Sequence, residues 1–292
     1  MNRRQQMAMA YVFEEKIMSK KITPEQIEKF QKTIYTFFKT NRRHFAWRRT
    51  TDPYKILLSE IMLQQTQVER VKTKYAEFIK AFPNFESLAK ASLKKILTVW
   101  QGMGYNRRAL YLQEIAIEIT KQFKGKFPRD PEVIKNFKGI GPNTLGSILA
   151  FAFNEPTIFI ETNIRTVFIH YFFRAKDKVA DQEIIPLIEQ TLDRTNPRIW
   201  YFALMDYGAY LKKLHTNPSR QSLHYTKQSK FEGSDRQIRG ALIKLLTQEV
   251  SISLQNLETH FPTTQPERLH TIIDRLLKEK LITQKGSKLF LD

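Results

Sequence analysis

Apolar residues recur at helical spacing along most of this chain. Ile27, Phe30, Ile34 and Phe37 form the first such face, and Thr23-Pro24 before them is typical of a helix N-terminus. A helix carrying Ile56, Leu57, Ile61 and Met62 is predicted from near Tyr54, and amphipathic helices are predicted over residues 68–82, 85–97, 167–173, 182–194 and 199–211. Strand-like alternation is absent from residues 23–211, so the fold class expected for this part is all-α.

The last part of the chain, residues 236–292, has a different pattern. Ile238, Leu242, Leu245 and Leu246 form one helix face, and helices are also predicted over residues 254–261 and 266–280. Residues 251–253 are a short strand candidate, and residues 281–291 read as a β-hairpin around Lys285-Gly286-Ser287. Three helices closed by a hairpin predict a small winged-helix module, which can contact DNA or dock another protein.

Two Gly-x-Gly segments, each placed between predicted helices, are the main candidates for ligand contact. In Gly139-Ile140-Gly141-Pro142 both glycines permit positive φ, and Pro142 suits the first turn of the helix that follows. The second segment is Gly102-Met103-Gly104, and neither follows a nucleotide-binding strand. Backbone N–H groups at such a helix start suit a DNA phosphate, although an ordinary tight turn has the same pattern.

The charge of the chain favours a polyanionic partner. Lys and Arg number 48 against 29 Asp and Glu, a net charge of +19. Residues 212–240 hold seven basic residues against two acidic ones, which predicts either a basic loop that orders on binding or a solvated linker. No membrane span or signal peptide is expected, and the absence of cysteine excludes a cysteine-held iron–sulfur cluster. We therefore expect a cytoplasmic, nucleoid-associated protein.

Six motifs in chain order resemble the helix-hairpin-helix (HhH-GPD) DNA glycosylase superfamily, and within it the MutY-like adenine glycosylase branch. They are Trp47-Arg48 with Asp52-Pro53-Tyr54, residues 59–68 (SEIMLQQTQV), residues 100–105 (WQGMGY), residues 139–144 (GIGPNT), residues 161–165 (ETNIR) and residues 203–209 (ALMDYGA).

The resemblance implies a two-lobed glycosylase core over residues 22–211. One lobe comprises residues 22–45 and 163–211, and the other is a six-helix lobe over residues 46–162. An N-terminal extension (1–21), a basic loop (212–235) and the winged-helix module (236–292) complete the expected domains.

Two glutamates are the expected catalytic residues. Glu60 lies on an otherwise apolar helix, where a carboxylate is costly unless it is partnered or used, and it matches the family's general acid with a raised pKa. Glu161 occupies the position of the family's second carboxylate, which is Asp in the family pattern and stabilises the sugar cation. The alternative for Glu161 is a helix cap. Removing a base needs both a proton on the leaving group and a counter-charge for the sugar.

The resemblance assigns further positions one by one. Gln65 and Tyr105 match residues that wedge into the duplex, and Asn143 replaces the Schiff-base lysine of bifunctional relatives, so lyase chemistry should be weak or missing. Arg48 is expected to support Glu60 or a phosphate, and Arg48 and Asn143 are the residues expected at the base pocket. The other expected DNA contacts are Gly139, Gly141, Thr144 and Arg108, and the carbonyls of Phe137 and Ile140 are expected to hold a potassium or sodium ion.

The chain departs from the family in two ways. The iron–sulfur cysteines that should follow Ala209 are missing, and the winged-helix module stands where the family has a Nudix-like domain that reads 8-oxoguanine. No other cofactor is expected.

The function expected from all of this is monofunctional removal of a mispaired or damaged base, with adenine favoured, by a monomer on double-stranded DNA. Two alternatives stay open. One is removal of thymine or uracil from G mispairs, or of a deaminated purine, and the other is a non-catalytic DNA-binding protein.

Overall fold

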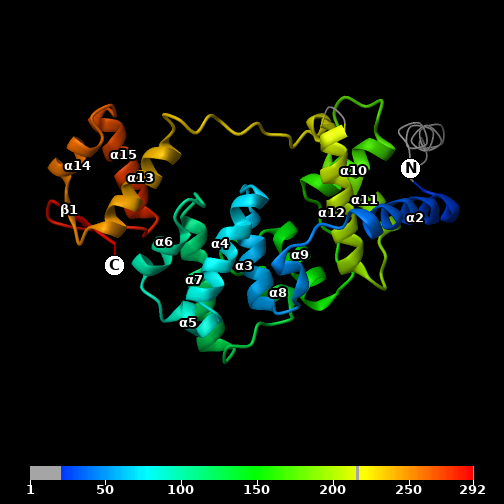
Figure 1. Ribbon diagram of the computed structural model, residues 1–292, viewed down its shortest axis with the longest axis horizontal. Coiled ribbons are helices and arrows are strands. Elements are labelled where there is room, and N and C mark those ends of the chain that lie inside the picture. Colours follow the sequence, from blue (N-terminus) through cyan, green and yellow to red (C-terminus); the bar gives the residue numbers. More distant parts are fainter. Residues whose placement is uncertain (1–20, 215–216, 292) are drawn as a thin grey trace. The chain divides into compact units, whose positions relative to one another are not determined.

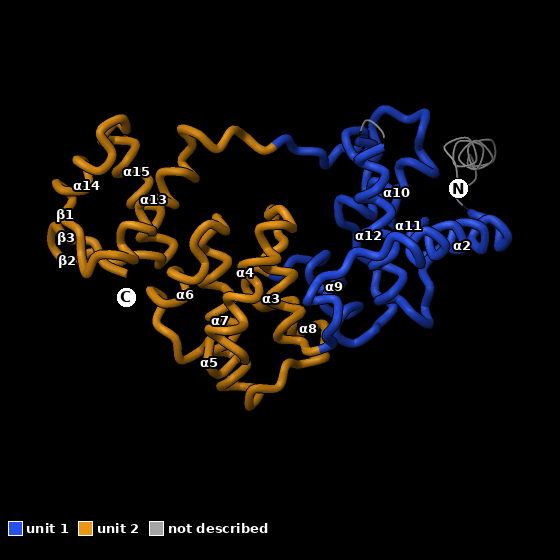
Figure 2. Tube along the Cα trace, viewed as in Figure 1, with its two compact units in different colours: residues 1–51, 140–227 blue, residues 52–139, 228–292 orange. Residues whose placement is uncertain are grey.

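The computed structural model describes residues 21–214 and 217–291, most of them helical (Figure 1). The expected N-terminal extension lies outside these ranges except for Lys21. The described chain forms two compact units, which Figure 2 shows in different colours. Unit 1 contains the described residues up to Thr51 together with Ile140–Lys227, and unit 2 contains Asp52–Gly139 and the described residues from Gln228 onward.

Unit 1 is a bundle of helices around an aromatic core. Its elements are α2 (Pro24–Asn41), the 3₁₀ turn η1 (Ala46–Arg49), α9 (Pro142–Phe153), α10 (Thr162–Phe172), α11 (Asp181–Thr191), α12 (Pro197–Leu214) and the 3₁₀ turn η2 (Pro218–Gln221). Phe30 of α2 is fully buried, and its ring lies 5.2–5.9 Å from the ring centroids of Phe168, Tyr171, Phe172 and Trp200. Aromatic pairs at this spacing stabilise the core beyond the contribution of the apolar area that they bury.

Helices α10 and α12 cross so closely that one glycine is required. A Cβ atom at Gly208 would lie 2.1 Å from the backbone oxygen of Asn163, far inside contact distance. Any side chain there would push the helices apart. The glycine therefore fixes how near the end of α12 comes to the start of α10.

Unit 2 contains the remaining core helices and the C-terminal module. The core helices are α3 (Pro53–Leu63), α4 (Val68–Ala81), α5 (Phe85–Ala89), α6 (Leu93–Trp100), α7 (Arg107–Gln122) and α8 (Pro131–Ile134). The module comprises α13 (Asp235–Gln248), β1 (Ile252–Ser253), α14 (Leu254–His260), α15 (Pro266–Lys278), β2 (Thr283–Lys285) and β3 (Lys288–Phe290).

Local capping explains where several helices begin. Thr23 forms a capping box with Gln26 at the start of α2, as its Thr-Pro sequence predicts, and Asp52 caps α3 ahead of Pro53. The prediction of a single helix over residues 85–97 is wrong. The Ser92 hydroxyl accepts a hydrogen bond from the Lys95 N–H and starts a new helix, so the segment forms α5 and α6.

The C-terminal module has the predicted winged-helix arrangement. Its three helices pack with an antiparallel sheet of strand order β1-β3-β2, in which Leu289 pairs with Ile252 on one side and Gln284 on the other. Gly286 has φ +59° in the hairpin turn between β2 and β3. Outside this module, the β-pairing that the structure describes is a single parallel bridge between Val179 and Ser222, so the core is all-α.

The module is attached to core helices within unit 2. The Gln101 amide donates to the Thr247 hydroxyl at 2.6 Å, and the Lys94 ammonium donates to the Glu249 carbonyl at 2.8 Å. These contacts bring α13 against α6. The basic segment after residue 211 is partly regular, because α12 continues to Leu214 and η2 follows.

The compact units divide the core differently from the expected lobes. Residues 140–162, expected in the six-helix lobe, belong to unit 1, where α9 packs against α12. Residues 46–49 form η1 and also belong to unit 1.

Candidate functional site

Glu60 lies near the end of α3, among side chains that are almost completely buried. Leu57, Leu58, Ile61 and Met62 are each at most 1% exposed, whereas Glu60 itself is half-buried. A carboxylate on so apolar a helix costs folding free energy unless it is partnered or used. This placement suits a group that must deliver a proton.

Glu161 is the N-cap residue of α10, so the capping alternative raised by the sequence is realised. Its Oε1 accepts hydrogen bonds from the backbone N–H groups of Asn163 (2.8 Å) and Ile164 (2.9 Å). Its Oε2 accepts from the Asn163 side-chain amide at 3.1 Å. Three donors hold the carboxylate in one orientation, which is compatible with an electrostatic role as well as a cap.

Lys212 adds a positive charge beside Glu161, which the sequence analysis did not identify. Its ammonium donates to Oδ1 of Asn163 at 2.8 Å, the same residue that contacts Glu161. Burial lowers the pKa of Lys212, and the Glu161 carboxylate opposes that effect. The sequence placed Lys212 in a basic loop, and it carried no other signal for this position.

Asn143 is exposed at the start of α9, and its side chain links this helix to the segment before Glu161. Oδ1 accepts a hydrogen bond from the Ile160 N–H at 3.1 Å. The segment that carries Glu161 is thereby tied to the first turn of α9. Asn143 has no amine that could form an imine with a sugar.

The hairpin glycines differ in their backbone conformation. Gly139 has φ +82°, the positive φ that a glycine permits, whereas Gly141 has φ −88°. Gly141 instead serves as the N-cap residue of α9, whose first turn includes Thr144. The backbone N–H groups of that turn suit a phosphate.

The carbonyls of Phe137 and Ile140 are the predicted ligands of a potassium or sodium ion. Carbonyl oxygens suit such a hard cation. The two residues belong to different compact units, and the site stays a prediction.

Gln65 and Tyr105, the two residues expected to wedge into DNA, share an unusual backbone conformation. Gln65 has φ +53° and Tyr105 has φ +47°, in the left-handed region that residues with a side chain seldom adopt. Such strain costs of order 1–3 kcal/mol and concentrates at functional sites. Both side chains are exposed. Their position is therefore maintained by the surrounding structure.

Arg108 is the residue that holds both of these segments. It is only 7% exposed, and its guanidinium makes its contacts inside the protein, while the DNA contact expected from the sequence stays a prediction. The guanidinium donates to the carbonyls of Ile61, Met62, Gln64, Met103 and Gly104 and to the hydroxyl of Thr66, at 2.6–3.1 Å. Burial lowers the pKa of Arg108 to about 10. It joins the end of α3 to the Gly102–Gly104 loop.

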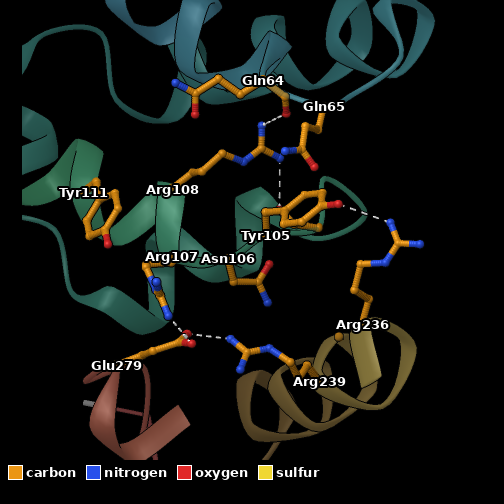
Figure 3. A pocket seen from close by; sticks show the side chains of 12 residues that line it. Gln64, Gln65, Tyr105, Asn106, Arg107, Arg108, Tyr111, Arg236, Arg239 and Glu279 are labelled. Atoms are coloured by element: carbon orange, nitrogen blue, oxygen red, sulfur yellow. Dashed lines mark hydrogen bonds and ion pairs between the residues drawn. The ribbon is translucent and has the colours of Figure 1, made fainter. Parts of the chain in front are cut away.

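A cavity of about 440 Å³ lies beside Tyr105 in unit 2 (Figure 3). Gln64, Gln65 and the start of α7 line it from the core, and Arg236, Arg239 and Glu279 line it from the C-terminal module. Glu279 pairs with both Arg107 and Arg239. Burial would raise the pKa of Glu279, but hydrogen bonds from Arg239 and Arg107 outweigh it and lower this pKa below its ordinary value. The sequence contained no signal for this arrangement.

Arg48 pairs with a carboxylate that the sequence analysis did not single out. Its side chain is 5% exposed and donates to Asp206, which is completely buried, at 2.9 Å. Arg43 donates to the same carboxylate at 2.6 Å. Two signals for Asp206 were present in the sequence, its place in the 203–209 motif and its position as an acid within an apolar run, as for Glu60. The predicted support of Glu60 or a phosphate by Arg48 remains untested.

The described part of the chain has neither a membrane-spanning helix nor a metal-binding group of His, Asp and Glu side chains. Residues 21–214 and 217–291 contain no helix long and apolar enough to cross a membrane. Within the same ranges, no group of three or more His, Asp or Glu side chains is placed to hold a metal ion.

Comparison with known proteins identifies a family over the middle of the chain. Residues 58–189 match the model of the HhH-GPD superfamily base excision DNA repair protein. These residues include Glu60, the two wedge candidates, the Gly139–Thr144 hairpin and Glu161.

Curated relatives extend the similarity on both sides. The adenine DNA glycosylase of Buchnera aphidicola subsp. Baizongia pistaciae is 36% identical over 65% of this chain and 54% of its own length. The adenine DNA glycosylase of Mycolicibacterium smegmatis is 27% identical over 88% of this chain and 94% of its own. The thymine/uracil-DNA glycosylase of Methanothermobacter thermautotrophicus is 30% identical over 62% and 84%. The chain thus spans about half the length of the Buchnera relative.

A solved structure shows the same arrangement of helices. The structure of a thermostable thymine-DNA glycosylase superposes with a TM-score of 0.57 at 29% identity, over 63% of this chain and 87% of that one.

Proposed function

Because this chain belongs to the HhH-GPD superfamily of base excision DNA repair proteins, we propose that it is a monofunctional DNA glycosylase. It hydrolyses the bond between a mispaired or damaged base and its deoxyribose. The observation that carries this proposal is Glu60, a half-buried carboxylate among fully buried apolar side chains inside the matched region. An acid at this position, inside the region that matches the family, can serve proton transfer.

The reaction needs two opposite electrostatic contributions. Glu60 gives its proton to the departing base as the glycosidic bond breaks, and the bonding electrons leave with the base. The Glu161 carboxylate stabilises the positive charge that develops on the sugar. Water then adds to the sugar carbon and loses a proton, which leaves an intact abasic strand. Asn143 cannot replace water as the nucleophile, because it lacks an amine.

Adenine is the favoured base, since the Buchnera and Mycolicibacterium relatives carry that name. A second candidate is thymine or uracil in a G mispair. It is favoured by the Methanothermobacter relative and by the thymine-DNA glycosylase structure. Removal of a deaminated purine would use the same chemistry. The substitution of Glu for Asp at position 161 and the presence of Asn143 are compatible with each of them.

The substrate form follows from the charge and from the wedge candidates. A net charge of +19 favours DNA, and residues that fill a gap in a base stack need a duplex to enter. We propose that the protein acts as a monomer on double-stranded DNA of the nucleoid, in the cytoplasm. A non-catalytic DNA-binding protein would have the same charge but would release no base.

A panel of duplexes tests the proposal. Adenine opposite G or 8-oxoguanine, thymine or uracil opposite G, and hypoxanthine opposite T would be incubated with excess protein. The released base would be identified by mass spectrometry. We expect release of one base class and strand cleavage only after alkali. No base release from any duplex that binds would identify the non-catalytic alternative.

Glu161 requires a test that separates chemistry from capping. Glu161→Gln should lower the single-turnover rate about a hundredfold to a thousandfold, the effect of losing one preorganised electrostatic group. Glu161→Asp should keep a measurable share, since the carboxylate remains and only its reach shortens. If Glu161 only caps α10, Glu161→Gln would keep the full rate and lose about 0.5–2 kcal/mol of unfolding free energy.

A further inference from the structure

The cavity beside Tyr105 brings the C-terminal module to a residue expected to enter DNA. The Tyr105 hydroxyl accepts hydrogen bonds from the Gln228 amide at 2.9 Å and from the Arg236 guanidinium at 3.3 Å, as Figure 3 shows for Arg236. Both donors precede or begin α13. The Arg236 guanidinium also lies 5.9 Å from the centre of the Tyr105 ring. The module therefore extends the surface around Tyr105.

The arginines that line this cavity differ in whether a carboxylate pairs with them. Arg107 and Arg239 both pair with Glu279, which fixes the module against α7. Arg236 donates to the Ser229 carbonyl at 2.7 Å and to the Tyr105 hydroxyl, but no carboxylate among the described residues pairs with it. Its guanidinium keeps an uncompensated charge and unused N–H donors at the edge of a cavity.

The position of the cavity indicates which nucleotide it would receive. Extruding a target base leaves its former partner unpaired in the opposite strand, and wedge side chains occupy the gap between the two. Gln65 and Tyr105 both line this cavity, so the unpaired partner base would lie next to it. Its volume of about 440 Å³ is within the range of small-molecule sites.

The chemistry of the lining favours one kind of base. The Tyr105 ring offers a stacking surface, and arginine is a donor-only group that forms two parallel hydrogen bonds with O6 and N7 of guanine. We infer that the C-terminal module completes a nucleotide subsite here, in which Arg236 reads the acceptor edge of a guanine left unpaired opposite the extruded base. This inference rests on the proposed function, because it needs an enzyme that extrudes a base.

Binding to an abasic analogue tests the inference without any catalysis. Duplexes would carry a tetrahydrofuran residue opposite G, A, C or T, and the affinity of the full chain would be measured at one fixed salt concentration. Wild-type protein should prefer G by about tenfold or more, the discrimination expected of one bidentate contact. Arg236→Gln should abolish that preference. Arg275→Gln is the matched control, since it removes the same charge from an exposed position on α15 outside the cavity.

A second variant tests the same subsite with little effect on folding. Tyr105→Phe keeps the ring but removes the hydroxyl that fixes Gln228 and Arg236, so it should weaken the preference for G while total affinity changes less. Melting temperatures of all variants show whether they fold.

Three outcomes would overturn the inference. Wild-type protein with no preference among the four bases would show that the cavity reads nothing. An equal loss for all four duplexes in Arg236→Gln, matching Arg275→Gln, would make Arg236 a phosphate contact. Tighter binding of every duplex by Arg236→Gln would make the module a cover over Tyr105. Failure of the proposed function would be seen separately, as the absence of base release from any duplex.

Discussion

The two compact units each bury an arginine, and they stabilise its charge in different ways. In unit 1, Arg48 lies against the completely buried carboxylate of Asp206. In unit 2, Arg108 donates to five carbonyls and one hydroxyl, and no described carboxylate pairs with it. Burial lowers the pKa of both groups, but only Arg48 has a carboxylate that opposes the effect.

This difference separates a structural arginine from one that prepares a functional surface. The charge of Arg48 is paired with a buried carboxylate inside unit 1, so its role lies within the fold. The charge of Arg108 is not cancelled. The carbonyls that hold it belong to segments containing Gln65 and Tyr105, whose strained backbone needs such support.

The largest effect is expected from breaking the pair in unit 1. Asp206→Asn leaves the buried guanidinium of Arg48 without a carboxylate, which should cost about 3–5 kcal/mol of unfolding free energy. Chemical denaturation measures this loss. Asp177→Asn, an exposed carboxylate of the same unit, is the matched control and should change little. A loss from Asp206→Asn no greater than that of the control would mean that the pair is not stabilising.

Arg108→Lys tests the arginine of unit 2. Lysine keeps the charge but has one nitrogen to replace two, so several carbonyls would lose a donor at about 1–3 kcal/mol of unfolding free energy. Affinity for the abasic-analogue duplex should fall with it, because Gln65 and Tyr105 are no longer held. Arg70→Lys on the exposed surface of α4 is the control. Wild-type affinity in Arg108→Lys would show that Arg108 acts through its charge alone.

The smallest loss of stability is expected when the whole pair of unit 1 is removed. Arg48→Met with Asp206→Leu replaces two buried charges by apolar groups, which is often neutral or stabilising by about 1–4 kcal/mol relative to the ion pair. Arg43 would lose a partner, but its side chain is 33% exposed and can be solvated. DNA affinity at fixed salt should be unchanged. A loss of affinity as large as that of Arg108→Lys would remove the distinction between the two arginines.

Much of the fold was predictable because it depends on local patterns. Helical periodicity and the Thr23-Pro24 start located α2, and the pattern of the last part of the chain predicted the winged-helix module. Serine is a preferred N-cap residue, so Ser92 was a signal in the sequence for a second helix within residues 85–97. The acid within an apolar run indicated Glu60 without any tertiary information.

The parts that could not be predicted depend on partners distant in the sequence. Asp206 and Arg48 are 158 positions apart, and nothing local says that they meet. Arg236 reaches Tyr105 across 131 positions, through docking of a separate module. The positive φ of Gln65 and Tyr105 could not be predicted either, because neither residue is a glycine. Contacts of Arg108 with the neighbouring carbonyls of Gln64 and Gly104 support this conformation.

The central claim, that this chain releases a base with Glu60 as the acid, is tested most directly by Glu60→Gln. The measurement is the single-turnover rate of base release from the duplex that the wild-type protein processes fastest, with duplex affinity measured in parallel. We expect the rate to fall about a hundredfold to ten-thousandfold, since glutamine cannot donate a proton as a carboxylic acid does, while affinity stays close to that of the wild type. A variant that keeps more than about a tenth of the wild-type rate would contradict the assignment of Glu60 as general acid.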